Sequence, residues 1–467
     1  MLREFDQDTI AAIVTPSGEG GVGVIRISGP EAIRIADKIF ESTSKRSVQD
    51  QKSFTARHGF IFARDGSGQK RKIDEVILLL MRSPKSYTRE DVVEISAHAG
   101  PVVLKTILEL VIQKGARLAA RGEFTKRAFL NGRMDLLQAE AVLDLVKSRT
   151  EMGQRWATAQ LTGLLSEKMK AMKDKLLNIL SHCEASIDFP EDALEPQSSA
   201  DAAGQLKQLE EELSSLLSKA AFGFIVKNGL KVVIAGRPNV GKSSLMNCLV
   251  KANRVIVTPF AGTTRDTVEE EIQIHGFPVR MVDTAGLRES DHPIEKEGIE
   301  RSKAAVAGSD LVLFVVDGSQ EWNGEDEALL KELGDRRKIL VVNKSDLPQK
   351  FTLEILKTRV DGMSAIRTSC VQEKGTDLLE KEIFCLITHG QIQASDESVV
   401  SSVRQKSLLE KTLQCIQDAK LACISGLSPE LVAADVRQAL DHLGTLVGEV
   451  VTDDILDQLF NQFCIGK

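Results

Sequence analysis

The sequence of 467 residues lacks the features that mark secreted, zinc-stabilised or membrane-spanning proteins. Its seven cysteines are scattered and form no C-x-x-C pair, which argues against disulfides and structural zinc and fits a reducing compartment. No apolar run approaches the roughly 20 residues of a membrane-spanning helix. Met1–Asp6 carry no signal-peptide core and no transit-like leader follows, so we expect a cytoplasmic protein, with bacteria as the favoured source.

Internal repeats, low-complexity tracts and an excess of basic residues are also missing. The net charge is −7 and the pI about 5.7, which argues against a protein that coats nucleic acids, although a local basic face stays compatible with it. With 42% hydrophobic and 27% charged residues, the composition is that of a soluble globular protein. The length exceeds one hydrophobic core, so we expect about two to four domains.

One segment combines glycine, lysine and serine in the order of a phosphate-binding loop. Residues 236–243 read G-R-P-N-V-G-K-S, after the apolar run Lys231–Ala235 and before the helix-like run Ser244–Val250. Glycines let backbone N–H groups surround a β-phosphate, and the N-terminus of the following helix adds its dipole. We expect Lys242 to neutralise phosphate oxygens and Ser243 to bind Mg²⁺. An ordinary turn after a strand would be the alternative if the segment stood alone.

Three further motifs follow in the order found in GTPases. Gly262–Asp266 offers Thr264 as a second hydroxyl ligand for Mg²⁺. Asp283–Gly286 closes an apolar strand, where the Asp would hold Mg²⁺ through water and the Gly N–H would sense the γ-phosphate. Asn343–Asp346, reading N-K-S-D, closes another strand.

The last motif selects the base. The carboxylate of Asp346 can accept both the N1–H and the N2 amine of guanine, a donor pair that adenine lacks, so the expected nucleotide is GTP. Thr368–Cys370 is placed to steady the base from the end of the next strand. The predicted GTP-binding residues are Asn239, Val240, Gly241, Lys242, Ser243, Ser244, Thr258, Pro259, Phe260, Ala261, Gly262, Thr263, Thr264, Asp283, Thr284, Ala285, Gly286, Asn343, Lys344, Asp346, Ser369 and Cys370.

The hydrophobic patterns divide the chain into four ranges. Residues 1–120 mix short β-rich runs with one helix, as in an α+β domain. Residues 121–228 and 389–467 carry amphipathic helical patterns, whereas residues 229–388 alternate strand and helix patterns. The predicted fold is a multidomain α+β and α/β protein, with a Ras-like P-loop GTPase domain inserted between two helical halves that pack together. Two separate helical domains are the alternative.

Two segments outside the GTPase motifs are distinctive. Arg121–Asp135 reads R-G-E-F-T-K-R-A-F-L-N-G-R-M-D, and Cys464–Lys467 ends the chain as C-I-G-K. Together with the inserted GTPase they resemble the MnmE/TrmE family of tRNA modification GTPases, and the resemblance extends from Thr15–Gly18 to the last residue. Prenylation of the last four residues fits poorly, because Gly466 is not aliphatic.

The resemblance implies a function in tRNA modification. Family members form homodimers and act with the flavoprotein MnmG/GidA as a heterotetramer, in which FAD belongs to the partner. They add an aminomethyl or carboxymethylaminomethyl group to C5 of the wobble uridine, position 34, of certain tRNAs. The one-carbon unit comes from 5,10-methylenetetrahydrofolate or 5-formyltetrahydrofolate, bound by the N-terminal domain. Neither DNA nor a membrane is implied.

The family's folate-binding pattern falls on Arg26, Glu94, Arg133 and Lys467. Cationic groups suit glutamyl carboxylates, and a carboxylate suits the pterin. Lysine is common in the family where Arg133 stands, and arginine keeps the charge but presents a planar fork. The resemblance also marks Cys464 as needed for the modification, which makes it a candidate nucleophile. Without the resemblance, these charged residues read as solvated surface charges and Cys464 as an inert tail cysteine.

The water-positioning residue of Ras-like GTPases is missing here. Leu287 stands where those proteins place a glutamine. The resemblance nominates Glu295 as the catalytic group that acts through water, beside Lys242 on the phosphates.

Potassium is the second element that the resemblance implies for hydrolysis. Asn239 resembles the residue through which the family binds K⁺, and the backbone carbonyls of Thr258, Phe260 and Thr263 would complete the ligands. A cation there neutralises transition-state charge, which predicts K⁺-stimulated hydrolysis with GTPase domains paired face to face. Arg265 acting in trans as an arginine finger is the alternative.

Two other function classes stay open at this point. One is a GTP-switch protein in ribosome assembly, which would have no use for a C-terminal C-I-G-K. The other is a dynamin-like assembly GTPase, against which the missing membrane-binding patch argues. Folate binding by residues 1–120 separates the modification enzyme from both.

Overall fold

The computed structural model describes residues 8–16, 18–64, 69–188, 197–253, 269–283, 306–350, 363–388 and 400–467. The chain divides into two compact units. Unit 1 comprises Met1–Leu143, Gln160–Lys207 and Lys411–Lys467, and unit 2 comprises Asp144–Ala159 and Gln208–Glu410. Among the helices of the described residues, none combines the length and the apolar composition needed to cross a membrane.

Unit 1 contains a seven-stranded sheet in the order β3-β4-β5-β6-β2-β1-β7. Neighbouring strands are antiparallel except for β1 and β7. The strands are β1 (Ile10–Ile13), β2 (Gly23–Ser28), β3 (Phe40–Ser42), β4 (Thr55–Arg64), β5 (Lys70–Met81), β6 (Val92–Ala97) and β7 (Arg117–Leu118).

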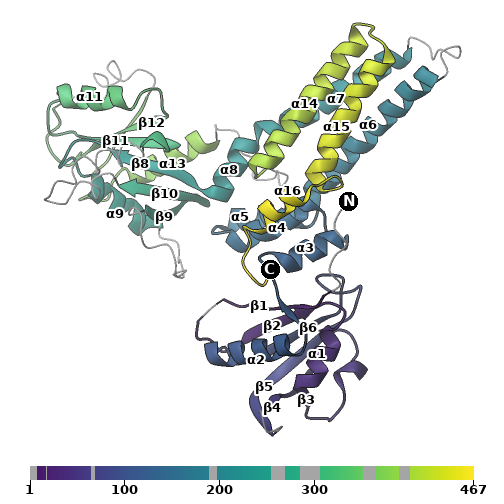
Figure 1. The fold of residues 1–467 in the computed structure, drawn as a ribbon. Coiled ribbons are helices and arrows are strands. Elements are labelled where there is room, and N and C mark those ends of the chain that lie inside the picture. The colour runs from purple at the N-terminus through teal and green to yellow at the C-terminus, as the bar shows by residue number, and fades with distance from the viewer. Residues whose placement is uncertain are drawn as a thin grey trace. The chain divides into compact units, whose positions relative to one another are not determined.

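One face of this sheet carries the hydrophobic core of its domain. Alternate residues of β2 point inward, so Ile25 and Ile27 are buried while Arg26 lies on the opposite face. Helices α1 (Ala32–Ile39) and α2 (Pro101–Gln113) cover the inward face, as Figure 1 shows. The short β-rich runs predicted for residues 1–120 are confirmed as strands, but two helices, α1 and α2, stand where the sequence predicted one.

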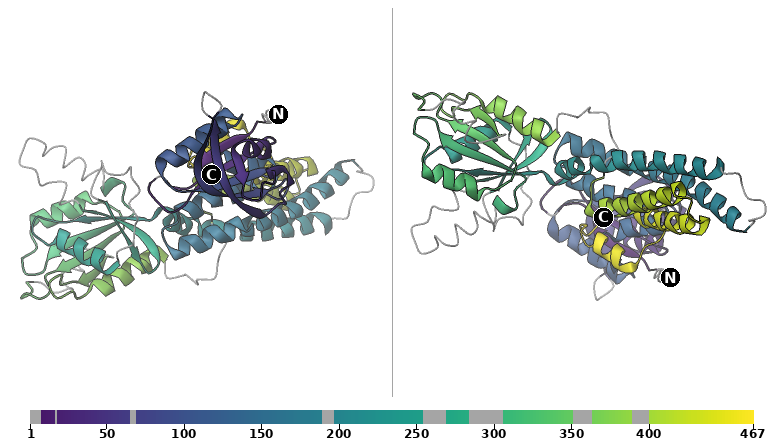
Figure 2. Two further views of the ribbon diagram at one scale, coloured as in Figure 1. Left: turned by 90° about the horizontal axis from the view of Figure 1, so that it is seen from below. Right: turned by 90° about the horizontal axis from the view of Figure 1, so that it is seen from above.

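The helices of unit 1 bring together two distant parts of the chain. Helix α6 (Leu164–Asp188) packs against α15 (Pro429–Val447), and the two lie side by side in Figures 1 and 2. An ion pair between Arg437 Nη2 and Glu184 Oε1, 2.8 Å long, joins them. The remaining helices with residues in unit 1 are α3 (Glu123–Leu130), α4 (Leu136–Lys147), α5 (Glu151–Leu161), α7 (Gln197–Ser218), α14 (Val403–Ile424) and α16 (Asp453–Phe460), with a 3₁₀ turn at Val48–Asp50.

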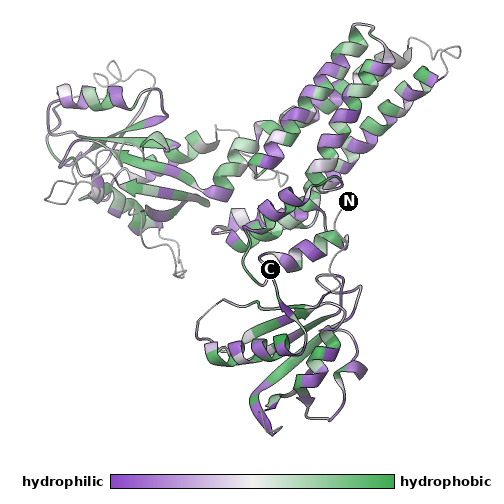
Figure 3. Ribbon diagram, viewed as in Figure 1, coloured by the Kyte–Doolittle hydropathy of each residue, from purple (hydrophilic) through white to green (hydrophobic). Residues whose placement is uncertain are grey.

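Unit 2 contains a six-stranded sheet in the order β13-β12-β11-β8-β10-β9. All pairs are parallel except β9 with β10. The elements are β8 (Leu230–Ala235), β9 (Glu269–Ile274), β10 (Phe277–Asp283), β11 (Leu311–Asp317), β12 (Lys338–Asn343), β13 (Ser364–Arg367), α8 (Ala220–Asn228), α9 (Lys242–Asn253), α11 (Gly324–Glu332) and α13 (Thr376–Thr388). Every residue of β11 is buried, as expected where both faces of a parallel sheet are covered, and Figure 3 shows how apolar the strand is.

The predicted fold class is confirmed: an α+β domain, helices and an α/β nucleotide-type domain all occur. Helices from both predicted halves do pack together. The four domain ranges stay predictions, because the two compact units cut the chain at other residues and assign 144–159, 208–228 and 400–410 to the unit of the six-stranded sheet.

Candidate functional site

The loop between β8 and α9 has the backbone of a phosphate-binding loop. Gly236, Asn239 and Gly241 all have positive φ, of 153°, 63° and 96°. A Cβ on Gly236 would lie 2.3 Å from the carbonyl oxygen of Val315, and one on Gly241 would lie 2.2 Å from Nδ2 of Asn343. Glycine is therefore required at both positions by contact as well as by φ. Because α9 begins at Lys242, the loop leads into a helix N-terminus, which favours an anion.

Lys242 lies inside this loop. Its Nζ donates to the carbonyl oxygens of Gly236 and Arg237, at 3.1 and 2.8 Å, and the side chain is buried. Ser243 and Ser244 follow on the first turn of α9 and are exposed. The structure thus places the predicted ammonium and the predicted Mg²⁺-binding hydroxyl next to each other on the loop.

The predicted base-reading segment lies against the same loop. Asn343 Nδ2 donates to the carbonyl oxygen of Val240 at 2.9 Å, and Lys344 Nζ donates to that of Asn239 at 2.9 Å. On the other side, Ser369 Oγ donates to Asp346 Oδ1 at 2.6 Å. Hydrogen bonds therefore tie together the three described motifs that the sequence singled out.

Cys370 completes this cluster and is held as a thiol. Its Sγ lies 3.3 Å from Asn343 Oδ1, and its carbonyl oxygen accepts from Cys248 Sγ at 3.5 Å. Burial raises the pKa of Cys370 to about 12, with the neighbouring Cys248 adding to the effect. The thiol can accordingly donate a hydrogen bond to the amide that organises the base-reading segment.

Asp317 is a residue of this site that sequence reasoning missed. Its buried carboxylate accepts from Lys344 Nζ at 2.7 Å and from Ser319 Oγ at 2.7 Å. Burial alone would raise the pKa of Asp317, but these hydrogen bonds outweigh it and lower the pKa. The available signal was an acid at the carboxyl end of the apolar run Leu311–Val316, where ligands gather in parallel sheets.

Part of the predicted site lies outside the described residues. This holds for Thr258, Pro259, Phe260, Ala261, Gly262, Thr263, Thr264, Thr284, Ala285, Gly286 and Glu295. For Asp283 the structure describes the backbone, which ends β10. The metal-binding and water-positioning roles of these residues stay predictions.

A second cluster forms in unit 1 around Tyr87, the chain's single tyrosine. Arg26 and Glu94 face each other across β2 and β6 and form an ion pair of 2.7 Å. The guanidinium of Arg26 lies over the rings of Tyr87 and Phe124, at 5.3 and 5.5 Å from their centroids. That of Arg133 lies 4.6 Å from the Tyr87 centroid and donates to the Tyr87 carbonyl oxygen at 2.9 Å.

The C-terminal segment ends beside this cluster. The N–H of Phe124 donates to the carbonyl oxygen of Lys467 at 3.2 Å, and Ile465 pairs with Arg121. Gly466 has φ of 99° and lies so close to β1 that a Cβ would be 2.7 Å from the carbonyl oxygen of Ile13. Arg26, Glu94 and Arg133 therefore meet at Tyr87, and the backbone of Lys467 lies beside Phe124. Cys464, three residues before the last, is exposed.

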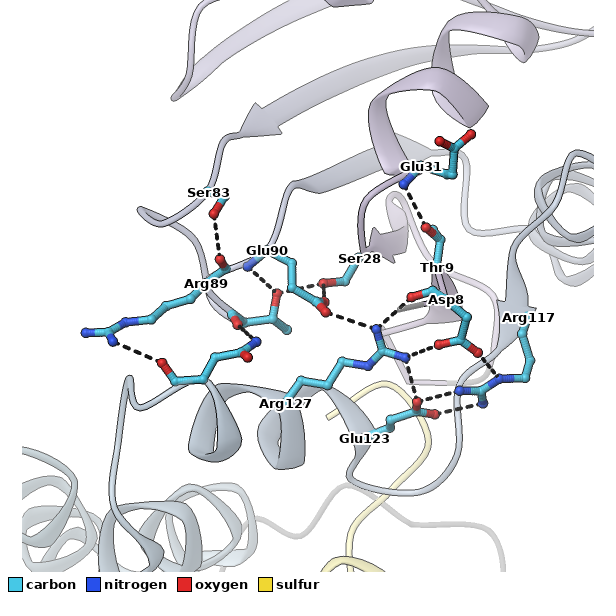
Figure 4. Close-up of polar contacts among 12 residues, drawn as sticks. Asp8, Thr9, Ser28, Glu31, Ser83, Arg89, Glu90, Arg117, Glu123 and Arg127 are labelled. Atoms are coloured by element: carbon cyan, nitrogen blue, oxygen red, sulfur yellow. Dashed lines mark hydrogen bonds and ion pairs between the residues drawn. The ribbon is translucent and has the colours of Figure 1, made fainter. Parts of the chain in front are cut away.

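Helix α3 is held in place by a network of charges, drawn in Figure 4. Arg127 is 3% exposed and binds Asp8, Glu90 and Glu123, while Arg117 binds Asp8 and Glu123. Burial alone would raise the pKa of Asp8 and of Glu123, but hydrogen bonds from Arg117 and Arg127 lower both. The network fixes the helix that carries Phe124 and Thr125, and Thr125 Oγ1 lies 2.9 Å from the Tyr87 hydroxyl.

A mostly parallel sheet with a phosphate-binding loop and an N-K-S-D segment defines a guanine-nucleotide-binding P-loop protein. Comparison with known proteins makes this more specific. The family model of the MnmE helical domain matches residues 136–464, and that of the GTP-binding protein TrmE N-terminus matches residues 9–133.

Curated relatives match over the full length. A tRNA modification GTPase MnmE of Clostridioides difficile is 42% identical over 463 residues, covering 99% of this chain and 100% of the relative. One of Thermoanaerobacter pseudethanolicus is 42% identical over 460 residues, covering 98% and 99%. This chain therefore belongs to the MnmE family of tRNA modification GTPases. As a GTPase it uses GTP and Mg²⁺.

Solved structures match only in part. The G domain of the FeoB iron transporter of T. maritima is 26% identical with a TM-score of 0.26, covering 33% of this chain and 96% of that one. Era of Aquifex aeolicus bound to GDP·AlF4⁻ is 22% identical with a TM-score of 0.27, covering 40% and 66%. The family assignment does not depend on these two likenesses.

Proposed function

We propose that this chain works as a homodimer with an MnmG/GidA-type flavoprotein and adds an aminomethyl or carboxymethylaminomethyl group to C5 of wobble uridine 34 in tRNA. The match to relatives named tRNA modification GTPase MnmE, at 42% identity over 99% of the chain, supports this proposal. It also disfavours the alternative of a GTP switch in ribosome assembly. In the proposal, GTP hydrolysis drives a conformational change and not the carbon chemistry.

The grouping of Arg26, Glu94 and Arg133 at Tyr87, with the Lys467 backbone beside Phe124, supports the folate part of the proposal. Bound tetrahydrofolate would supply the one-carbon unit. The exposed guanidinium of Arg133, which stacks on Tyr87, suits a glutamyl carboxylate. Glu94, fixed by its ion pair with Arg26, suits the N–H groups of the pterin. The donor set therefore fits a folate.

Direct binding tests this assignment. We would titrate the full chain with 5-formyltetrahydrofolate and measure its dissociation constant by calorimetry. Glu94→Gln and Arg133→Met should each weaken binding about tenfold or more, the effect of losing roughly 1.4 kcal/mol. Arg34→Met, a change at an exposed arginine of α1, is the matched control. Unchanged affinity in both test variants would remove the folate site from this cluster.

The proposal further assigns K⁺-stimulated hydrolysis through pairing of GTPase domains, with Asn239, Thr258, Phe260 and Thr263 as K⁺ ligands. Asn239 has φ of 63°, so Asn239→Gly removes the side chain without straining the loop, unlike Asn239→Ala. We would compare GTP hydrolysis in KCl and NaCl at equal ionic strength. A K⁺-specific stimulation that Asn239→Gly abolishes is expected, and equal rates in both salts would favour Arg265 acting in trans.

Glu295 and Cys464 are proposed as catalytic residues for different steps. Glu295→Gln should reduce GTP hydrolysis while GTP binding persists, since the residue would act on the attacking water. Cys464→Ser should abolish tRNA modification while hydrolysis continues. Mass spectrometry of digested tRNA and phosphate release separate the two, and a Cys464→Ser enzyme that still modifies tRNA would exclude the thiol from the chemistry.

A further inference from the structure

A buried ion pair joins the phosphate-binding loop to helix α11. Arg237, the second residue of the loop, donates from Nε to Oδ1 of Asp326 at 2.7 Å. The two side chains are 13% and 1% exposed. Removing water from a carboxylate is costly unless a hydrogen-bonded cation compensates for it. The buried charge of Asp326 is therefore compensated by Arg237. None of the roles assigned above to the loop uses the Arg237 side chain.

The position of Asp326 is set by the first turn of α11. Its Oδ2 accepts from the N–H of Asn323 at 3.2 Å, and Asn323 Oδ1 accepts from the N–H groups of Glu325 and Asp326, at 3.0 and 3.3 Å. This reciprocal arrangement is a capping box. The cap holds the carboxylate in one orientation, and the carboxylate in turn holds the Arg237 guanidinium.

The backbone of Arg237 touches the catalytic lysine. Its carbonyl oxygen accepts from Lys242 Nζ at 2.8 Å, beside the carbonyl oxygen of Gly236 at 3.1 Å. Any displacement of Arg237 therefore moves a group that orients the Lys242 ammonium. The adjoining Gly236 has φ of 153° and lies against the carbonyl oxygen of Val315 in β11. The loop therefore cannot shift toward that strand.

We propose that Arg237 and Asp326 are positioning residues for nucleotide binding. The ion pair fixes the first half of the phosphate-binding loop against α11 before GTP arrives, so that the loop amides and Lys242 meet the phosphates with little rearrangement. Holding a site in its bound geometry raises affinity by lowering the cost of ordering on binding. Since GDP and GTP share the β-phosphate, the pair serves both nucleotides alike.

A double-mutant cycle on the full chain tests this assignment. We would measure dissociation constants for GDP and for a non-hydrolysable GTP analogue, together with KM, kcat and the melting temperature. Arg237→Met should raise both dissociation constants and KM roughly tenfold, because the loop must be ordered on binding, and should change kcat less. Asp326→Asn keeps the size of the side chain and its cap hydrogen bond, and should raise the dissociation constants and KM in the same way. It provides the test if Arg237→Met does not fold.

Two further variants separate positioning from stability. Arg237→Met combined with Asp326→Asn should bind no more weakly than Arg237→Met alone, because the two residues act as one unit. Asn323→Ala removes the side-chain half of the cap but keeps the Asn323 N–H that holds Asp326 Oδ2, so it should lower the melting temperature with little change in affinity.

If Arg237→Met and Asp326→Asn bind nucleotide as tightly as the wild type and only their melting temperature falls, the ion pair is merely structural and the proposal is overturned. Additive losses in the double variant would overturn it as well.

Discussion

Replacing Arg127 with methionine should destabilise unit 1 strongly. The side chain is 3% exposed, and its partners Asp8, Glu90 and Glu123 are 33%, 22% and 12% exposed. Methionine retains most of the apolar stem but removes the ion pair of Glu90 and leaves Asp8 and Glu123 with Arg117 alone. Breaking a buried pair costs about 3–5 kcal/mol, and we expect the lower figure because the partners can draw in water. For a unit of this size, about 3 kcal/mol corresponds to a fall in Tm of roughly 6–12 °C.

The assay must distinguish the two units. Scanning calorimetry with and without GDP and Mg²⁺ does so, because ligand raises the transition of the unit that binds it and leaves the other in place. The GDP-insensitive transition is the one to compare. Arg34→Met is the control: its ion pair with Glu31 is formed by side chains 63% and 47% exposed, and such pairs contribute about 0–1 kcal/mol. Equal shifts for Arg127→Met and Arg34→Met would refute the reasoning.

Three more predictions concern the same chain. The pKa of Asp8 and of Glu123 is lower in the folded protein than the ordinary values of 3.8 and 4.5. The stability that these two carboxylates add to unit 1 is therefore complete above about pH 4.5 and lost as the pH falls below it. The Tm of the GDP-insensitive transition should drop steeply from pH 5 to 3. Because burial raises the pKa of Cys370 to about 12, iodoacetamide at pH 8 should label it slowly, as measured by peptide mass spectrometry. Gly466→Ala should destabilise unit 1 by roughly 1–3 kcal/mol, read as a lower Tm, because φ is 99° and Ile13 blocks the added Cβ.

Each of these predictions has an internal comparison. The acid-induced fall in Tm should be shallower in Arg127→Met, and an identical slope would place the titrating groups elsewhere. Cys464 is exposed and should react faster than Cys370; equal rates would contradict the burial argument. Gly426→Ala introduces alanine at φ of 65° with no atom within 4 Å of the new Cβ, so a loss as large as that of Gly466→Ala would exclude a steric cause.

The geometry of the phosphate-binding loop could be predicted from sequence because its constraints are local. Gly236 is required by its contact with Val315 of β11 and Gly241 by its contact with Asn343, the last residue of β12, and ligands gather at this carboxyl edge of a parallel sheet. The Asn343–Asp346 segment follows β12 for the same reason. A short pattern therefore contains most of the information needed to recognise the site.

Other features depend on partners far away in the chain. Arg127 reads as one more charge in an amphipathic helix, and its burial follows only from Asp8, 119 residues earlier. The apolar stripe of α6 predicts a helix but not that α15 covers it. Asp326 likewise reads as the start of a helix, and nothing in the local pattern connects it with Arg237, 89 residues before it. Hydrophobic periodicity does not determine which residues, distant in the chain, contact one another.

The two segments most distinctive in sequence prove to be one structural feature. Arg121 pairs with Ile465, and the N–H groups of Gly122 and Phe124 donate to carbonyl oxygens of Cys464 and Lys467. The N-terminal turn of α3 thus provides the backbone partners of the C-terminal residues, while its side chains support the cluster around Tyr87. A change in either segment must disturb the other. The backbone pairing gives a physical reason why two distinctive segments more than 300 residues apart, R-G-E-F-T and C-I-G-K, occur together in one chain.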